Sequence, residues 1–359
     1  MRACFVVHGA AWSGAARAFA DAASLLAAHG YETCLVAPAG SETERILLGA
    51  GHDVIGMARG GGGLRSGWRL HAVVSRRLIE VLFVHDDREH FAAAAAIRFA
   101  GRGAVVRRIP SGERLALGRD GRLAMRMAAT GFVFAHADDL RSATPPRGAL
   151  AAHVAPPGVA LDPPPSAAIG AIQAATGQRL AIVAGADQRR DALVALRALA
   201  LLAPRLPALR ATVFAPAADT DAVRLEAAAL GVADRIDWRP TGASCRDGLA
   251  GAALAWVIAA SDDAAYAMLD ALSLGVPVVA ERSVVTARFV DDGVTGVLRH
   301  RGGEAEWASV VAATLARTEP LAAMRAAATR AAARWPLDAG ADGWLQVTEA
   351  ARDRARWTG

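Results

Sequence analysis

Two carboxylates, Asp262 and Asp270, stand near each other in the stretch SDDAAYAMLDALSLGVPVVA at residues 261–280. The apolar run LAWVIAAS before them predicts a buried strand, and a helix is predicted to begin near Ala264. Open α/β sheets bind ligands beyond the carboxyl ends of their strands, and the N–H groups at a helix N-terminus attract phosphate. Asp270 is eight residues after Asp262, and each residue of a helix turns by about 100°. The two side chains therefore differ in direction by about 80° around the helix axis, so they lie loosely on the same side. A ligand with hydroxyl groups at both ends and a pyrophosphate between them, a nucleotide-sugar, suits this arrangement.

Each aspartate also has a purely structural interpretation. Directly before a helix, Asp262 would act as an N-cap, because a side-chain oxygen there accepts a hydrogen bond from the first turn. Asp270 is harder to explain in this way, since it lies between Leu269 and Ala271 in an otherwise apolar helix. A buried charge without a partner would be costly there, which favours a role in ligand binding.

Short apolar runs alternate with helical segments along the whole chain. In the first half, the expected strands and helices are ACFVVHG, GAARAFADAASLLAAHG, YETCLVAP, IEVLFVHDD, HFAAAAAIRFAGRG, AVVRRIP, TGFVFAHAD and AAHVAPPG. In the second half, the strands RLAIVAG, ALRATVFAP, RIDWRP, LAWVIAAS and VPVVAE alternate with helices, and three helices near residues 304–317, 319–334 and 340–356 follow. Such alternation predicts parallel sheets of the α/β class.

A proline-rich stretch divides the chain. Residues 155–168, APPGVALDPPPSAA, hold five prolines, which resist both helix and sheet and predict an interdomain linker. We therefore expect one α/β domain over residues 1–160 and a second over residues 161–335. Residues 336–359 are expected to form a C-terminal helix that crosses back to the first domain. The glycine-rich segment RGGGGLRSG at 59–67 is expected to be a flexible loop.

Composition excludes several classes of protein. Hydrophobic residues make up 53% of the chain and charged residues 21%, which is globular rather than disordered. Cys4, Cys34 and Cys245 lie far apart in the sequence, which argues against a zinc site or a disulfide framework and fits a reducing cytoplasm. No apolar run reaches the roughly 18–20 residues of a membrane span. The chain has no lysine and no G-x-S-x-G, so P-loop chemistry is excluded and an α/β-hydrolase is disfavoured.

The positive charge is concentrated in the first half. Residues 1–165 carry 19 arginines against 14 acidic residues, a net charge of +5, whereas residues 166–359 carry 21 of each. An anionic partner such as a lipid surface would therefore meet the first half, although an ordinary soluble surface is the simpler explanation. The stretch RSGWRLHAVVSRRLIEV at 65–81 has arginines beside Trp68 and Leu70. It is either an ordinary surface helix or an interfacial helix on an anionic membrane.

The second half resembles the nucleotide-binding domain of a GT-B glycosyltransferase, most nearly the large retaining family numbered 4. That family carries two acidic residues, normally glutamates, with seven residues between them, then an alanine, a glycine and PVVA. The corresponding residues here are Asp262, Asp270, Ala271, Gly275 and PVVA at 277–280, followed by VDDGVTGVL at 290–298. AHGYETCLVAP, PPGVALD and the C-terminal helices also have family counterparts, so the resemblance covers nearly the whole chain. It implies a GT-B fold, in which two Rossmann-like parallel-sheet domains face each other across a cleft.

Carried over position by position, the resemblance implies a donor site in the second half. Asp270 would hold the ribose hydroxyls of the donor, and Asp262 would meet hydroxyls of the sugar. Arg190, with Arg189, would neutralise phosphate charge as the leaving group forms, the alternative being a solvated helix start. The pyrophosphate would be approached by the backbone of Asp263, Ala264, Ala265 and Tyr266.

In the first half, the resemblance places His85, at the end of the strand VLFVH, against the donor sugar; an ordinary polar strand end is the alternative. Catalytic roles would thus fall on Asp262, His85 and Arg190. Gly9 and Gly14 flank the first strand–helix turn, where the family has an acceptor-side loop, although any such fold uses glycine there.

The resemblance also implies an activity and a set of partners. It describes a bacterial enzyme of cell-envelope glycan biosynthesis that transfers a sugar with retention from a UDP- or GDP-linked nucleotide-sugar. The acceptor would be a glycan, a lipid-linked group or a protein. No metal is obligatory and no nucleic acid takes part. The expected location is cytoplasmic, with a peripheral position on the inner face of the membrane as an option.

The sequence departs from the family pattern at several positions. Both acids are aspartates, one methylene shorter than glutamate. Asp263 adds a negative side chain where a glycine-containing turn is usual, Ala186 replaces an arginine, and Arg288 replaces a glutamate. These departures support a second hypothesis, a catalytically inactive GT-B protein that acts as a binding or scaffold module. A nucleotide-sugar epimerase of the same two-domain fold is disfavoured, because the block at 262–298 has the transferase pattern.

Overall fold

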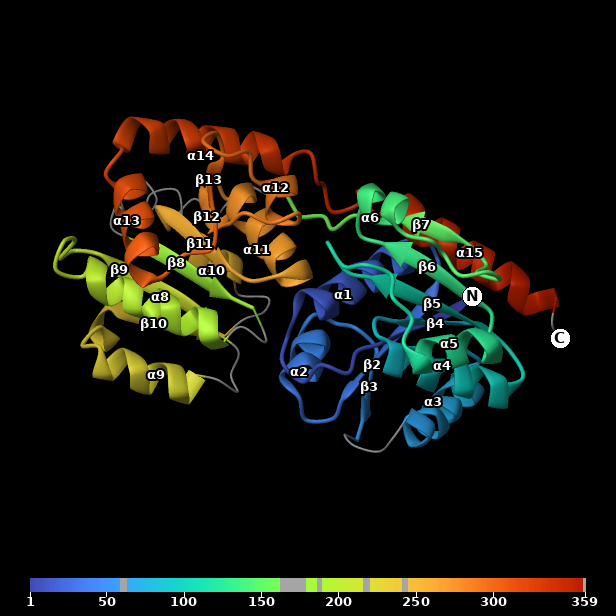
Figure 1. Ribbon diagram of the computed structural model, residues 1–359. Coiled ribbons are helices and arrows are strands. Elements are labelled where there is room, and N and C mark those ends of the chain that lie inside the picture. The colour runs from blue at the N-terminus through green and yellow to red at the C-terminus, as the bar shows by residue number, and fades with distance from the viewer. Residues whose placement is uncertain (59–62, 162–178, 186–188, 216–219, 241–244, 358–359) are drawn as a thin grey trace. The chain divides into compact units, whose positions relative to one another are not determined.

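The chain folds into two compact units, which are described separately: residues 1–157 with 338–359, and residues 158–337 (Figure 1). The computed structural model describes residues 1–58, 63–161, 179–185, 189–215, 220–240 and 245–357. Residues 162–168 of the expected linker lie outside the described residues.

The first unit is built on a seven-stranded sheet whose neighbouring strands are all parallel. Its strands are β1 (Arg2–Val6), β2 (Glu32–Pro38), β3 (Val54–Met57), β4 (Val81–Val84), β5 (Ala104–Ile109), β6 (Thr130–Phe134) and β7 (Ala152–Val154). They lie in the order β3-β2-β1-β4-β5-β6-β7. The central strand β1 pairs Cys4 with Cys34 on one side and Phe5 with Phe83 on the other.

Helices cover both faces of this sheet. They are α1 (Gly14–Ala28), α2 (Glu42–Gly49), α3 (Gly63–Arg77), α4 (Asp87–Ala100), α5 (Arg119–Met127), α6 (Ala137–Ser142) and α15 (Ala341–Trp357). Buried side chains of α1, α2 and α15 pack with Phe5 and Phe83, whereas those of α3, α4 and α5 pack with Cys4 and Leu82. Successive side chains of a strand point to opposite faces, so both faces of the sheet are buried.

The C-terminal helix α15 belongs to the first unit, where it packs against β5, β6, β7 and α1. Trp344 meets the stacked rings of Phe5 and Phe83 edge-on, at centroid distances of 6.3 and 5.7 Å. Gly343 permits a close approach to β7, because a Cβ there would lie 1.9 Å from the carbonyl oxygen of Val154.

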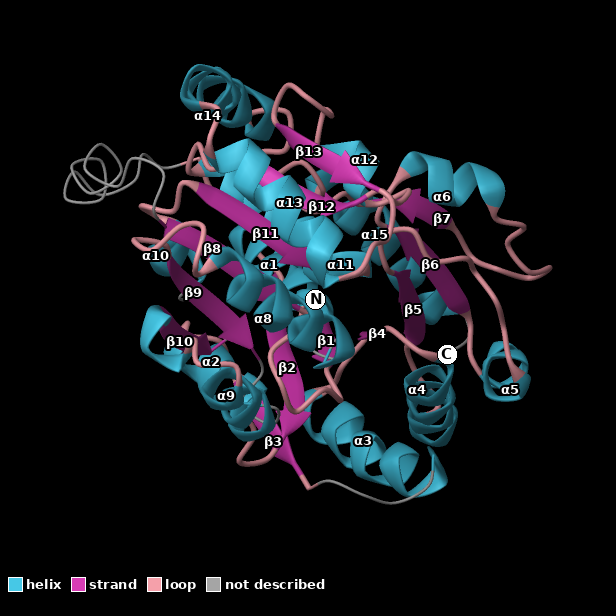
Figure 2. Ribbon diagram, turned by 60° about the vertical axis from the view of Figure 1, so that its left-hand side comes forward, coloured by secondary structure: helices cyan, strands magenta, loops and turns pink. Residues whose placement is uncertain are grey.

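The second unit has a six-stranded parallel sheet. Its strands are β8 (Arg179–Ala184), β9 (Arg210–Ala215), β10 (Ile236–Pro240), β11 (Leu254–Ile258), β12 (Val278–Glu281) and β13 (Gly296–Arg299). Figure 2 shows them side by side in the order β10-β9-β8-β11-β12-β13. Both units therefore contain the strand order of the doubly wound Rossmann-like fold.

The helices of the second unit divide between the two faces of its sheet. They are α8 (Arg189–Leu202), α9 (Thr220–Ala229), α10 (Cys245–Leu249), α11 (Ser261–Ser273), α12 (Thr286–Phe289), α13 (Glu304–Leu315) and α14 (Thr318–Ala332). On one face α10, α11 and α12 pack with Val278 and Leu298. On the other, α8, α9 and α13 pack with Val279 and Val297. Helix α14 contributes to both clusters.

The glycine-rich segment at 59–67 differs from its expectation. Helix α3 begins at Gly63, so residues 63–67 are helical rather than a loop, while residues 59–62 lie outside the described residues. A Cβ at Gly67 would lie 3.0 Å from Cβ of Ala95 in α4. This glycine therefore serves the close packing of α3 on α4, which overrides its low helix propensity.

Helix α11 begins at Ser261, three residues before the expected start at Ala264. Its N-cap is Ala260, which is extended at φ −122° and ψ 168° and makes no side-chain capping bond. The polar residue that usually signals a helix start is thus missing from the cap position. The N-cap interpretation of Asp262 is therefore wrong, because Asp262 is the second residue of the helix.

We expect Gly343→Ala to destabilise the protein, because the added Cβ would overlap the backbone of β7 and overpacking costs about 1–3 kcal/mol. Thermal or urea unfolding of the full chain would measure the loss. Gly49→Ala is the matched control, since an added Cβ at the end of α2 meets nothing within 4 Å. The control should be neutral or slightly stabilising. Equal midpoints for the two variants would contradict the close docking of α15.

Candidate functional site

In each sheet the chain order reverses beside one central strand. In the first unit β2 and β3 lie on one side of β1, and β4 to β7 lie on the other. In the second unit β9 and β10 lie on one side of β8, and β11 to β13 lie on the other. The connections that follow the two strands at such a reversal diverge, and ligands of open α/β sheets bind in the resulting crevice. Functional residues are therefore expected after β1 and β4, and after β8 and β11.

The two aspartates of the sequence motif lie on α11, which follows β11. Asp262 stands in its first turn and Asp270 near its C-terminal end, and each is only 2% exposed. Most of the side chains between them are also buried, so this helix is enclosed over nearly its whole length. The structure thus places both carboxylates on one buried helix at the strand reversal of the second unit.

The four residues expected beside the pyrophosphate belong to the same helix. Asp263 is half-buried, whereas Ala264, Ala265 and Tyr266 are buried. The amide of Ala264 donates to the carbonyl of Ala260 at 3.2 Å, which places it within the helical hydrogen-bond pattern. The side chains of the two alanines pack into the core of the second unit.

Arg189 and Arg190 begin α8, the helix after β8. Strand β8 is the direct neighbour of β11, so the start of α8 and the start of α11 follow adjacent strands. The side chains of both arginines lie outside the described part of the chain, and so does Ala186. Arg288 is described and lies half-buried in the short helix α12.

The VDDGVTG segment has a structural role of its own. Asp291 forms an ion pair with Arg334 at 3.1 Å, and Asp292 accepts from the amide of Leu298 at 2.9 Å. Gly296 has no room for a side chain, because a Cβ there would lie 2.1 Å from the carbonyl oxygen of Val278. The close packing at Gly296 holds β13 against β12, while Asp292 attaches the turn to β13 and Asp291 attaches it to the chain after α14, which explains this part of the motif without any ligand.

His85 follows β4, at the strand reversal of the first unit. Its ring stacks on Phe19 of α1 with centroids 3.7 Å apart, and its Nε2 lies 2.9 Å from the carbonyl oxygen of Ala15. A carbonyl oxygen can only accept, so Nε2 carries the hydrogen in this contact. His85 therefore ties the end of β4 to the first turn of α1.

The turn between β1 and α1 contains Gly9 and ends at Gly14, the first residue of α1. Ser13 caps this helix by accepting from the amide of Ala16 at 3.3 Å. A Cβ on Gly9 would find its nearest neighbour at 3.4 Å, so this position does not require glycine for steric reasons. The turn is also tied to α2, because the Thr43 hydroxyl donates to the carbonyl of Ala11 at 3.0 Å.

A buried carboxylate, Glu89, links the ends of β1 and β4. It is 4% exposed, and its Oε1 lies 3.1 Å from Nδ1 of His8 and 3.2 Å from the backbone nitrogen of His8. Its Oε2 accepts from the amide of His85 at 2.7 Å. Glu89 also completes a capping box with Asp86 at the start of α4. The sequence analysis missed Glu89, although the spacing Asp-x-x-Glu in HDDREH is the signal of such a box.

His8 and Glu89 each favour the charged form of the other. The hydrogen bond with Glu89 raises the pKa of His8 above its ordinary 6.5, and this outweighs the opposing effect of partial burial. Burial by itself would raise the pKa of Glu89, but the hydrogen bond and charge of His8, with smaller contributions from His85, lower it below its ordinary 4.5. Glu89 is therefore ionised at neutral pH, and His8 holds a proton more readily than a free imidazole.

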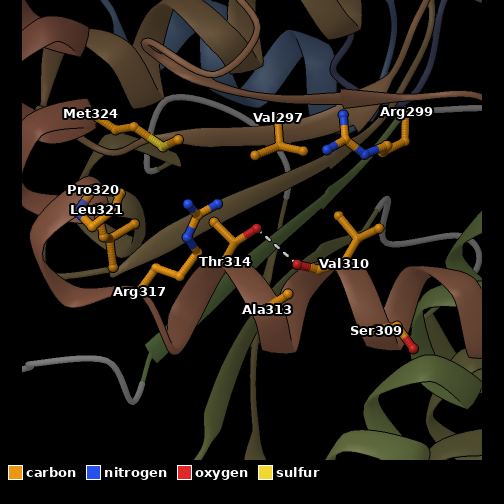
Figure 3. A pocket seen from close by; sticks show the side chains of 10 residues that line it. All are labelled: Val297, Arg299, Ser309, Val310, Ala313, Thr314, Arg317, Pro320, Leu321 and Met324. Atoms are coloured by element: carbon orange, nitrogen blue, oxygen red, sulfur yellow. Dashed lines mark hydrogen bonds between the residues drawn. The ribbon is translucent and has the colours of Figure 1, made fainter.

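A cavity of about 280 Å³ lies elsewhere in the second unit, between β13, α13 and α14. Figure 3 shows the guanidinium groups of Arg299 and Arg317 on either side of Val297. Val297 packs with the α13 face of the sheet, whereas its neighbour Leu298 packs with α11. The cavity is therefore on the opposite face of the sheet from α11 and its aspartates. Within the described residues, no group of His, Cys, Asp or Glu could hold a metal ion.

Comparisons with solved structures match the chain over nearly its whole length. HepE of Anabaena in complex with UDP-glucose superposes with a TM-score of 0.72 at 14% identity, covering 99% of this chain and 100% of that one. Sucrose-phosphate synthase of Thermosynechococcus elongatus superposes with a TM-score of 0.70 at 11% sequence identity, covering 99% of each chain. A glycosyltransferase from Rickettsia africae superposes with a TM-score of 0.69 at 12% sequence identity, covering 97% of each chain. No protein-family model and no curated protein matches the sequence.

These likenesses define the fold. The chain has the GT-B fold, with two Rossmann-like parallel-sheet units, as the sequence resemblance implied. The identities are too low to carry an activity from those proteins to this one, so the chemistry has to be argued from the residues of this chain.

The stability that His8 contributes should depend on pH. Because its pKa is raised in the folded protein, this contribution is fully present below pH 6.5 and is lost as pH rises through the folded value. The lowered pKa of Glu89 gives a contribution present above pH 4.5 and lost as pH falls through the folded value. We therefore expect His8→Gln to lower the melting temperature more at pH 5.5 than at pH 9, as measured by thermal unfolding. The same decrease at both pH values would contradict the ion pair.

Proposed function

We propose that the protein is a glycosyltransferase that moves a sugar from a UDP- or GDP-linked donor to a glycan, lipid-linked or protein acceptor. The proposal includes retention at the anomeric carbon and no obligatory metal. One observation carries it: two buried carboxylates, Asp262 and Asp270, stand on the helix after β11, the position at which the sequence resemblance implies the donor site. The match to HepE, whose structure contains UDP-glucose, supports this choice of ligand.

The proposed donor site assigns one task to each group. Asp270 binds the ribose hydroxyls, and Asp262 binds hydroxyls of the sugar. The first turn of α11, over residues 263–266, approaches the pyrophosphate, since the positive end of a helix dipole favours an anion. In our proposal Arg190, with Arg189, meets the same phosphates, which is supported by the start of α8 after β8, the strand beside β11.

The donor site has to stabilise the negative charge that develops on the leaving nucleoside diphosphate. When the bond from the anomeric carbon to the diphosphate oxygen breaks, its electron pair leaves with the nucleoside diphosphate. Cations and N–H donors that face this oxygen in a dry site are each worth several kcal/mol, roughly 3–4 for one donor. Arg189 and Arg190 supply that charge in our proposal, which offsets the acidic Asp263 and the loss of an arginine at Ala186. In the same proposal His85 faces the donor sugar, and the turn from Gly9 to Gly14 faces the acceptor.

A binding or scaffold module without catalysis is the second candidate. The observation behind it is the pair of departures at Ala186, where an arginine is lost, and at Asp263, where a negative charge is added, both at the expected diphosphate position. Release of a nucleoside diphosphate from any sugar nucleotide would exclude this candidate. Donor binding without release would support it.

Asp270→Asn tests the donor site with little change in side-chain volume. A hydrogen bond to a charged group is worth about 1.5–3 kcal/mol, so we expect donor affinity to fall roughly 10- to 100-fold. A ligand that binds only the folded protein raises its melting temperature by mass action. A thermal-shift screen with UDP-glucose, UDP-N-acetylglucosamine, GDP-mannose and ADP-glucose should therefore stabilise the parent, and the best donor should stabilise Asp270→Asn much less.

The control for this experiment is Asp237→Asn, which makes the same chemical change on an exposed strand end where the carboxylate meets Arg239. This control should respond to the donor as the parent does. A parent that responds to none of the four donors would contradict the transferase, and an unaltered response of Asp270→Asn would remove Asp270 from the site.

We also propose that α3 makes a peripheral contact with an anionic membrane. Trp68 is 65% exposed and packs edge-on against the exposed Phe99 of α4 at 6.1 Å, while Arg76 and Arg77 stand in the last turn of α3. Leu70, in contrast, is fully buried and takes no part in this surface. Among the residues that the structure describes, no helix is long and apolar enough to cross a membrane.

Charge reversal of Arg76 and Arg77 tests this contact. Each arginine near an anionic surface contributes about 1 kcal/mol, so Arg76→Glu with Arg77→Glu should abolish cosedimentation with phosphatidylglycerol vesicles. Because Arg77 also pairs with Asp53 at 2.7 Å, the melting temperature of the variant has to be measured alongside. Trp68→Ser is a second variant that leaves this ion pair intact and should weaken binding as well. Binding of the folded variants equal to that of the parent would remove the membrane contact.

A further inference from the structure

The cavity between β13, α13 and α14 lies within the second unit and takes no part in the roles proposed above. Its volume of about 280 Å³ is near the lower end of the roughly 300–1,000 Å³ that small-molecule sites occupy. Close-packed proteins contain few voids larger than a water molecule, so a space of this size needs an explanation. The side chains around it indicate which kind of ligand fits.

The walls of the cavity are mostly apolar. Val297 contributes from β13, Val310 from α13, and Leu321 and Met324 from α14. Figure 3 shows Leu321 and Met324 gathered with Pro320 on one side of the cavity. Removal of aliphatic surface from water is favourable, so these walls fit an aliphatic chain.

Two hydroxyl groups at the cavity are already engaged within α13. The Ser309 hydroxyl donates to the carbonyl of Ala305 at 3.0 Å, and the Thr314 hydroxyl donates to the carbonyl of Val310 at 2.8 Å. A hydroxyl has a single hydrogen to donate, so neither group has a donor left for a ligand. The side-chain donors that remain at the cavity are those of its two arginines, Arg299 and Arg317.

Arg317 stands at a position where helix formation does not call for an arginine. It is the N-cap residue of α14 and makes no side-chain capping bond, because a guanidinium group cannot accept a hydrogen bond. The positive end of the α14 dipole repels its charge, whereas the end of α13 at Leu315 attracts it, so the two effects oppose each other. Among the described residues, none pairs with its guanidinium group. The charge of Arg317 is therefore available at the cavity.

Arg299 is only partly neutralised. Its Nη1 donates to the carbonyl of Leu298 at 2.9 Å and lies 3.7 Å from the carboxylate of Asp292. Asp292 pairs more closely with Arg282, so two arginines share one carboxylate. The guanidinium group of Arg299 has five N–H groups, and most of them remain for a ligand. Since the residues that line the cavity include no acid, its charge is positive.

We propose that this cavity binds a phosphate monoester that carries a short aliphatic chain. The guanidinium groups of Arg299 and Arg317 meet the phosphate, because arginine binds phosphate by paired hydrogen bonds and a monoester carries a charge of about −1.5 to −2 at pH 7. The chain packs against Leu321 and Met324. The ligand is a free molecule rather than a lipid of a bilayer, because the apolar surface lines a cavity between three elements instead of a projecting face.

This site is separate from the proposed donor site. The cavity lies on the α13 face of the sheet, whereas Asp262 and Asp270 stand on α11 on the other face. The inference therefore does not depend on the proposed glycosyltransferase activity, and it is tested by binding alone.

The first experiment measures binding of octyl phosphate to the full chain by titration calorimetry, at concentrations where the probe is monomeric. Because Arg317 would lose its hydrogen bonds to a charged group, we expect Arg317→Gln to weaken binding roughly 10- to 100-fold. Arg330→Gln makes the same chemical change at an exposed position in the last turn of α14 and is the matched control. This control and Asp270→Asn should both bind octyl phosphate as the parent does.

A second variant, Ala313→Phe, tests the cavity itself. Ala313 is an exposed residue of α13 that lines the cavity, so a larger side chain fills the space without entering the core. The variant should fold and should lose binding of octyl phosphate.

The two halves of the probe test the chemistry of the ligand. Inorganic phosphate lacks the chain and octanol lacks the charge, so each should bind at least roughly 10-fold more weakly than octyl phosphate. A phosphate monoester gains its second negative charge near pH 6, so the affinity for octyl phosphate should increase from about pH 5 to pH 7.5.

Several results would overturn the proposal. They are no binding of octyl phosphate to the parent, equal binding by the parent, Arg317→Gln and Ala313→Phe, or binding of octanol as tight as that of octyl phosphate. If Arg317→Gln lost cosedimentation with phosphatidylglycerol vesicles while the parent ignored monomeric octyl phosphate, the anion would be a lipid headgroup and the proposed free ligand would be wrong. None of these results bears on the transferase, whose test is donor binding by the parent and by Asp270→Asn.

Discussion

Parallel pairing of every strand is the constraint on which both candidate sites depend. Parallel strands cannot be joined by hairpins, so each connection crosses the sheet and all strands end at the same edge. The order then has to reverse once, beside β1 in one sheet and β8 in the other. This reversal brings His8 into hydrogen-bond distance of Glu89, 81 residues further along the chain. It also starts α8 and α11, with their arginines and aspartates, from adjacent strands.

Burial lowers the pKa of a histidine and raises that of a carboxylate, and α4 carries one of each side by side, His90 and Glu89. His90, fully buried beside Thr130, has its pKa lowered to about 4 by burial and stays neutral. Glu89, the preceding residue, is just as deeply buried, yet its pKa is lowered rather than raised because His8 and the amide of His85 bond to its charged form. A carboxylate in such a position would be costly without these donors. The turn after β1 and the end of β4 are therefore held together by one ionised group.

The order of strands and helices could be read from the sequence because long apolar runs and helical periodicity report burial directly. The edge strands β3 and β13 could not, because Val54–Met57 is partly exposed without clear alternation and Gly296–Arg299 is a four-residue segment that begins with glycine. The start of α11 was misplaced because its N-cap residue is an alanine. The glycines at the start of α3 were taken for a loop because the packing of Gly67 against α4 is not visible in the sequence. At the candidate site, Asp262 and Asp270 were recognisable as a spaced pair. Glu89 was not, because its partner His8 is distant in the sequence.

The motif block therefore separates into a structural part and a chemical part. Asp291, Asp292 and Gly296 are accounted for by contacts that hold the turn before β13 and β13 itself in place, so their presence supports the fold and is neutral about activity. The chemical part is the pair of aspartates, each one methylene shorter than a glutamate. Both are only 2% exposed and stand on a helix that otherwise packs into the core. The contacts that attach β13 do not account for these two buried carboxylates, so the chemical question of the motif comes down to Asp262 and Asp270 on α11.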